Sequence, residues 1–222
     1  MHSFLQTQLT LLTMDNGVDI VIDYSKNWGA NRFKALLAGN LQSIKINKVN
    51  VPSTFSGSAS DSATFFSDRE QYFLTASAPK SKFSLNLEYS YDKFTVGTHL
   101  TYFGGLKTLG FGETSAPTNA ADPYFPYVTL DKTGAVVPEI FDFKAKVTTD
   151  LYVSYKISKI VSATIGADNI FNVHPDKAVV PGSVSLDTGS SSWGDSESGG
   201  PFDAVQMGYN GMRLFSKLSF NF

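Results

Sequence analysis

Residues 81–91, SKFSLNLEYSY, decide the fold class because apolar and polar side chains alternate along them without interruption. The odd positions carry the larger apolar side chains: Phe83, Leu85, Leu87, Tyr89 and Tyr91. The even positions are polar: Lys82, Ser84, Asn86, Glu88 and Ser90. Successive side chains of a strand point to opposite faces, whereas a helix repeats every 3.6 residues. The stretch therefore predicts a β-strand with one apolar and one polar face.

The same alternation recurs along most of the chain. It is clear in residues 93–103, 143–157, 161–171 and 212–222 and weaker in 18–24 and 31–46, and residues 4–13 add an eighth candidate. The clear stretches run for about 10–15 residues, against about 5–6 in a typical soluble strand and about 9–11 in a membrane-spanning one. We therefore predict an all-β chain of seven to eight long strands in an antiparallel meander.

Short and long connections alternate between these strands. Short turns are expected at 27–30, at Asp92 and at Ser158–Lys159, and long polar connections at 47–80, 104–142 and 172–206. Outer-membrane barrels alternate in this way, with tight periplasmic turns and long extracellular loops. Aromatic residues that suit a membrane interface also gather near the short turns: Tyr89, Tyr91, Phe94, Tyr155, Phe220 and Phe222. We interpret the long connections as solvated loops.

Composition excludes several classes of protein. Charged residues make up 17% of the 222-residue chain, below the roughly 25% of soluble domains. The net charge of -2 argues against a nucleic-acid partner, which requires a basic excess. With no cysteine, the chain has no disulfide, thiolate metal site or cysteine nucleophile. No stretch approaches the ~20 apolar residues of a membrane-spanning helix.

The apolar faces have two interpretations. They pack into the core of a soluble β-sandwich, or they face lipid while the polar faces line a wide lumen. Strand length, the alternation of loops and the aromatic ends favour the second interpretation, an antiparallel transmembrane β-barrel segment.

Four segments resemble the C-terminal barrel region of TonB-dependent outer-membrane receptors. Gly166–Asn172 (GADNIFN) resembles the family's NLFN-type segment, and Ala78–Leu87 resembles its Pro-x-x-Lys strand entry. Gly17–Ile20 resembles a strand start, and Gln206–Phe222 resembles the closing strand with its terminal aromatic residue. The matches follow the family's order along residues 17–222.

This resemblance implies that residues 1–222 are the C-terminal portion of a 22-stranded barrel, without the plug domain and the upstream strands. The implied function is uptake of a scarce nutrient: a ferric siderophore, cobalamin or a glycan. The implied partners are the outer-membrane bilayer, the rest of the receptor, the TonB system and the barrel-assembly machinery. The C-terminus is then periplasmic and the long loops are extracellular. The family's assembly signal maps onto Leu218, Phe220 and Phe222.

Two alternatives from other classes remain. One is a complete small eight-stranded outer-membrane barrel with a structural or adhesive role, which requires residues 4–13 to pair with 207–222. The other is a soluble carbohydrate-binding sandwich. No catalytic constellation or cofactor motif is present, so we expect no enzyme and no cofactor.

Single residues give weaker signals. His99 is expected to be a hydrated lumen residue and His174 a plain loop residue, because no histidine has a metal-ligand partner at i+3 or i+4. Asp187, Asp195 and Glu197 lack the order of a calcium loop and predict a solvated acidic loop. Asp168 and Asn169 are expected at a turn or rim. The candidates for ligand contact are aromatic residues of the loops: Tyr124, Phe125, Tyr127, Trp193 and Phe202.

Overall fold

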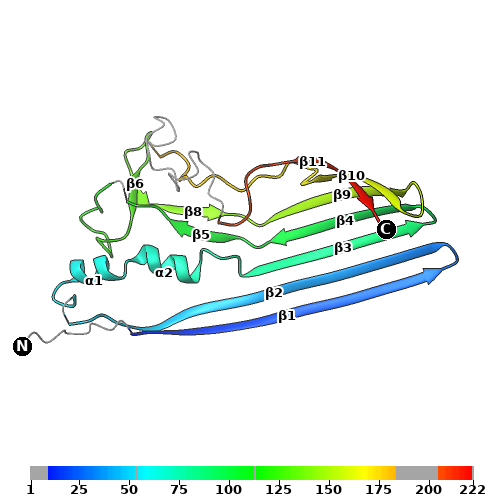
Figure 1. The fold of residues 1–222 in the computed structure, drawn as a ribbon. Coiled ribbons are helices and arrows are strands. Elements are labelled where there is room, and N and C mark those ends of the chain that lie inside the picture. The colour runs from blue at the N-terminus through cyan, green and yellow to red at the C-terminus, as the bar shows by residue number, and fades with distance from the viewer. Residues whose placement is uncertain (1–9, 54, 113, 184–204, 222) are drawn as a thin grey trace, which may run out of the picture.

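The computed structural model describes residues 10–53, 55–112, 114–183 and 205–221. Its main element is a seven-stranded antiparallel sheet in the order β1-β2-β3-β4-β9-β10-β11 (Figure 1). The strands of this sheet are β1 (Thr10–Trp28), β2 (Asn31–Asn50), β3 (Ser81–Tyr91), β4 (Phe94–Phe103), β9 (Lys146–Lys156), β10 (Val161–Asp168) and β11 (Arg213–Phe220). Each strand of this sheet lies beside the strand that precedes it in the chain, and four further small strands lie outside the sheet. The predicted antiparallel meander is confirmed.

The first strand corrects one prediction. Residues 10–13 and 18–24 belong to a single strand, β1, which pairs with β2 from Thr10 to Trp28. Residues 4–13 are therefore not a separate eighth strand, and residues 4–9 lie outside the described part of the chain. Smaller differences occur at strand ends. β9 begins at Lys146 and not at residue 143, and β10 ends at Asp168 because Asn169 adopts a left-handed φ of 48°.

The strand register places most of the apolar positions on one face of the sheet, while Leu36 and Phe215 lie on the other. One row of directly paired residues runs Ile22, Leu37, Leu85 and Leu100 across four strands, and another row on the same face runs Val96, Val153 and Ile165. These side chains are not covered by another layer. Ile165 is 66% exposed and Leu214 is 74% exposed. A sandwich would bury this face, so the described residues contradict the soluble sandwich.

The height of the apolar face matches a bilayer. β3 has 11 residues, which at about 3.4 Å each and a tilt of about 45° span a height of about 26 Å. The apolar band of an outer-membrane barrel is about 25 Å tall. Aromatic pairs lie at both limits of this band, with Phe94 and Tyr155 at the short-turn end and Phe83 and Tyr102 at the other. β1 and β2, with 19 and 20 residues, extend beyond it.

The described parts of the long connections gather at one end of the sheet, and the short turns and the end of β11 lie at the other (Figure 1). The prediction that these connections are plain solvated loops is wrong for two of them. The first contains α1 (Ala59–Phe65) and α2 (Asp68–Thr75). The second contains β5 (Leu106–Leu109), β6 (Tyr127–Thr129), β7 (Val136–Pro138) and β8 (Ile140–Phe143), which form two small sheets.

Among the described residues, the cluster of buried hydrophobic side chains lies in these connections, whereas in the main sheet Ala167 of β10 is the buried hydrophobic residue. Leu106, Phe141, Phe143 and Ala178 pack together, and Val180 and Val205 contact them. Gln206 ties the cluster to the sheet, because its Nε2 donates to the carbonyl oxygens of Gly104 and Lys144 at 2.9 Å each. The connections therefore form an ordered cap over one end of the strands.

Both edges of the main sheet are open in the described residues. β1 pairs only with β2, and β11 pairs only with β10. β1 has 19 residues and β11 has 8, so the two edges differ more than twofold in length. Open edges cannot persist in lipid, since unpaired backbone groups there cost several kcal/mol each. The described residues do not close the sheet. Among the described residues no helix is long and apolar enough to cross a membrane.

Candidate functional site

The polar face of the sheet carries two cross-strand networks. In the first, the Tyr152 hydroxyl donates to Glu88 Oε2 at 2.8 Å, and Lys34 Nζ lies 3.6 Å from Glu88 Oε1. The Tyr152 ring lies over Gly97, where a Cβ atom would fall 2.3 Å from the ring. These residues come from β2, β3, β4 and β9. The network therefore connects four strands across the face that is expected to line the lumen.

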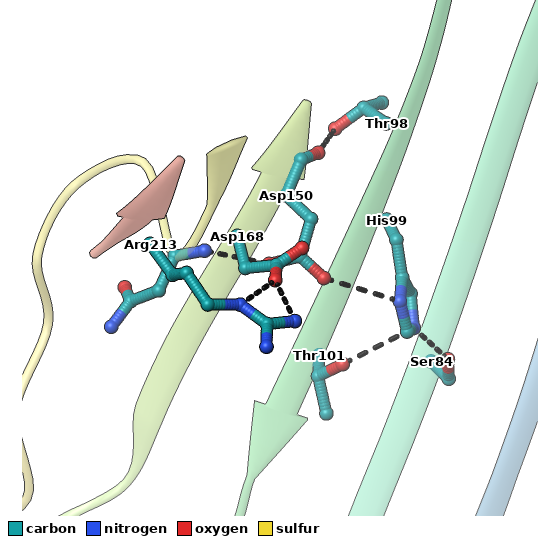
Figure 2. A network of polar contacts seen from close by, with 8 residues as sticks. Ser84, Thr98, His99, Thr101, Asp150, Asp168 and Arg213 are labelled. Atoms are coloured by element: carbon teal, nitrogen blue, oxygen red, sulfur yellow. Dashed lines mark hydrogen bonds and ion pairs between the residues drawn. The ribbon is translucent and has the colours of Figure 1, made fainter. Parts of the chain in front are cut away.

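The second network centres on His99 (Figure 2). Its Nε2 lies 2.6 Å from Ser84 Oγ, and its Nδ1 lies 3.4 Å from Asp150 Oδ2. The other Asp150 oxygen accepts a 2.7 Å hydrogen bond from the backbone N–H of Asn169. His99 is therefore a half-exposed residue of the polar face, and side chains of the two neighbouring strands hold its ring.

Asp168 and Asn169 anchor the connection between β10 and β11. Asp168 Oδ2 accepts from Arg213 Nε at 2.8 Å and from Nη2 at 2.6 Å (Figure 2). The Asn169 side chain bonds both the N–H and the C=O of Val173. Asn172 Oδ1 accepts from Met212 N at 2.9 Å. The GADNIFN segment therefore closes the base of this connection, and its polar side chains are structural.

A carboxylate–lysine contact holds the same connection against β9. Burial acts to raise the pKa of Asp176, but hydrogen bonds from Lys146 Nζ at 2.6 Å and Lys144 N at 2.8 Å outweigh it and lower the pKa. Asp176 therefore stays ionised to a lower pH than in the unfolded chain. Its contribution to stability is present above the ordinary value of 3.8 and is lost as the pH falls below it.

Two adjoining hollows in the ordered cap are the best candidates for a ligand site. The first, about 330 Å³, lies between Val49 at the end of β2, the two helices and Asp122. The second, about 300 Å³, lies between the start of α2 and residues 110–112, 114–116 and 123–126. Asp68 and Tyr124 line both hollows. Concave sites with apolar walls and a few convergent polar groups are typical of ligand binding.

Two carboxyl groups meet where the hollows join. Burial raises the pKa of Asp68, and the hydrogen bond and like charge of Asp122 raise it further. The Asp122 carboxylate is also fixed by Tyr124 N, which donates to it at 2.9 Å. Protonation of Asp68 relieves the repulsion between the two carboxylates. The stability that this pair contributes is therefore present below pH 3.8 and is lost as the pH rises through the raised pKa.

Substitution of Asp122 by Asn tests this pairing. Without the like charge, the pKa of Asp68 is expected to fall towards 3.8, although burial continues to hold it somewhat higher. A carboxyl-carbon NMR titration of Asp68 measures the change. Asp142→Asn, at an exposed residue of β8, is the matched control and should leave the Asp68 titration unchanged. An Asp68 titration that is the same with and without Asp122→Asn would contradict the effect of Asp122 on the pKa of Asp68.

The predicted aromatic candidates have different roles. Tyr124 is 48% exposed and lines both hollows, whereas Tyr127 is buried and packs edge-to-face against Phe125.

The remaining residues singled out in the sequence lie elsewhere. His174 Nδ1 lies 3.1 Å from the Tyr209 carbonyl oxygen at the base of its loop. Other predicted candidates lie outside the described residues: Trp193, Phe202, Asp187, Asp195, Glu197 and Phe222. Leu218 and Phe220 lie on the exposed apolar face.

Sequence reasoning missed four residues of the hollows: Asp68, Arg69, Phe111 and Asp122. One signal was available. Ser67 and Glu70 have the Ser-x-x-Glu spacing of a capping box, and the structure shows that box at the start of α2. Recognising this spacing would have placed Asp68 and Arg69 in the first turn of a helix.

Within the described residues, no group of three or more His, Asp or Glu side chains could hold a metal ion.

Comparison with solved structures finds outer-membrane receptors. The ferripyoverdine receptor of the outer membrane of Pseudomonas aeruginosa aligns over 78% of this chain with 15% identity and a TM-score of 0.44. The FpvAI–pyocin S2 complex aligns over 94% with 14% identity and a TM-score of 0.49. The pyoverdine receptor FpvA of strain PAO1 aligns over 96% with 13% identity and a TM-score of 0.42.

The aligned region is a small part of these receptors. The chain covers 17%, 19% and 27% of the three solved chains. These neighbours are TonB-dependent receptors, the family that the sequence resembles. No family model and no curated protein matches the sequence.

Proposed function

We propose that this chain is the C-terminal part of the barrel of a TonB-dependent outer-membrane receptor that takes up a scarce nutrient. The observation that carries the proposal is the two-faced sheet. Its exposed apolar face, Ile165 and Leu214 included, has the height of a bilayer, and its opposite face is crossed by hydrogen-bonded polar side chains. The two open edges call for further strands of the same barrel.

The small eight-stranded barrel is less well supported. It needs a strand at 4–13 that pairs with 207–222, but residues 10–13 continue into β1 and pair with β2. No described residue of β1 pairs with β11. The difference in length between these two edge strands also argues for separate partners.

Uptake tests the function directly. Deletion of the gene is expected to lower uptake of one labelled nutrient, either a ferric siderophore, cobalamin or a glycan, by about tenfold or more. A protonophore should abolish the same uptake, because receptors of this family are powered from the inner membrane. Unchanged uptake after deletion of the gene, or uptake that persists with the protonophore, would contradict the proposal.

The orientation of the chain can be tested with single cysteines, since the sequence has none. Lys132→Cys lies in a turn of the second long connection, and Lys159→Cys lies in the short turn between β9 and β10. A membrane-impermeant maleimide is expected to label Lys132→Cys on intact cells and Lys159→Cys only after the outer membrane is permeabilised. The reverse pattern would place the long connections in the periplasm.

A further inference from the structure

The second hollow of the cap has a positively charged group at its wall. Its lining includes Ser67 and Arg69 at the start of α2, Phe111, Thr114, and the aromatic pair Tyr124 and Phe125. The Arg69 guanidinium carbon lies 4.1 Å from the centre of the Phe111 ring. Phe111 is 70% exposed, so the stacked pair is open to solvent.

The guanidinium of Arg69 is available to a ligand. No other described residue forms an ion pair or hydrogen bond with it. The Arg69 guanidinium lies over the Phe111 ring, and an arginine in such a contact keeps its N–H donors, which lie in the guanidinium plane, for other partners. That edge suits the two oxygens of a carboxylate or phosphate, which arginine binds in a bidentate manner.

The carboxyl groups beside Arg69 in the helix have other partners. Glu70 Oε2 accepts from both the backbone N–H and the hydroxyl of Ser67. Asp68 is hydrogen-bonded to Asp122, and burial and this neighbour raise the pKa of Asp68. The same capping box fixes the first turn of α2 that carries Arg69.

The aromatic and proline residues that line the hollow suit a flat apolar body. Phe125 contacts Tyr72 edge-to-face at 6.3 Å and Tyr127 at 6.0 Å, so its ring is held from two sides. Pro123 and Pro126 continue this wall. Aromatic and proline surfaces of this kind pack against rings with little loss of side-chain entropy.

We infer that this hollow binds an anionic oxygen group, a carboxylate or phosphate, attached to a ring-shaped apolar body. Arg69 holds the oxygens and the wall of Tyr124 and Phe125 receives the ring. The inference rests on the proposed function, which places these connections outside the cell, and it narrows the nutrient to an anionic, ring-bearing class. The same oxygen chemistry occurs in a soluble nutrient and in the phosphates of lipopolysaccharide.

The test uses the protein extracted from its own outer membrane in a nonionic detergent. Saturation-transfer NMR measures binding of benzoate, phenyl phosphate and the neutral benzamide. Benzoate and phenyl phosphate are expected to bind about tenfold or more tightly than benzamide. Arg69→Gln should remove that preference, and Phe111→Leu should weaken benzoate binding severalfold. Lys107→Gln, at an exposed cation of β5 outside the hollow, is the control and should bind like the wild type.

Three results would overturn the inference: equal binding of benzamide and benzoate, an unchanged preference in Arg69→Gln, or displacement of benzoate by stoichiometric purified lipopolysaccharide. The last result would assign the hollow to a lipid phosphate and not to a soluble nutrient. These outcomes are separate from the uptake test. Nutrient uptake can depend on the gene and on the proton gradient while the second hollow shows no preference for anions. That combination would reject the proposed ligand class and leave the receptor function standing.

Discussion

Ile165→Arg is expected to destabilise the protein in a bilayer by about 2–4 kcal/mol, the cost of an arginine at the middle of the lipid-facing surface of a barrel. Ile165 lies in β10 between Val153 and Ser216 and is 66% exposed. In a soluble protein a substitution at such an exposed position usually changes stability by no more than about 0.5 kcal/mol. The size of the loss in stability therefore shows whether the apolar face contacts lipid or water.

The measurement is the free energy of unfolding by urea or guanidinium for the protein reconstituted in bilayers. Asn86→Arg is the matched control, because Asn86 lies on the polar face of β3 opposite His99. We expect this control to cost less than about 1 kcal/mol, since a hydrated lumen accepts the charge. Equal costs for Ile165→Arg and Asn86→Arg would contradict a lipid-facing surface.

Gly97→Val is expected to cost about 1–3 kcal/mol, although Gly97 lies within a strand where valine is otherwise favoured. The Tyr152 ring occupies the place of the missing side chain, with its Cε1 and Cζ atoms 2.3 Å from an ideal Cβ. Valine must displace the ring and break the hydrogen bond from Tyr152 to Glu88. The expected loss is therefore larger than the gain in strand propensity.

A double-mutant cycle isolates this contact. In a Tyr152→Ala background the space over Gly97 is empty, so Gly97→Val should cost much less or become neutral. Thermal unfolding of the four variants in the same bilayer gives the coupling. Equal costs of Gly97→Val with and without Tyr152 would show that the Tyr152 ring does not hinder a larger side chain at position 97.

The main sheet was predictable because each strand has a strict period of two, and β3 is the clearest example. The N-terminal part of β1 was missed for a physical reason. Beyond Val18 towards the N-terminus, β1 pairs with the part of β2 that extends beyond the end of β3, so residues 10–17 lie outside the two-faced part of the sheet and do not show the alternation. Pattern reasoning therefore split one long strand into two candidates.

The cap was harder to predict because its order comes from contacts between connections distant in sequence. Gln206 bonds to Gly104 and Lys144, and Arg69 stacks on Phe111. Only the capping box of Ser67 and Glu70 is local enough to be recognised in the sequence. Tyr124 was among the predicted ligand contacts and lines both hollows, but the charged residues beside it depend on tertiary packing.

The most direct test of the account is a nitroxide scan of residues 82–91 in bilayers, one cysteine at a time, for collisions with oxygen and with a water-soluble nickel complex. We predict that oxygen, which concentrates in lipid, reaches positions 83, 85, 87, 89 and 91. The nickel complex should reach positions 82, 84, 86, 88 and 90, because they line a hydrated lumen. The account would be contradicted if the nickel complex reached both sets of positions, or if its access did not alternate from one residue to the next, because β3 would then not span a membrane.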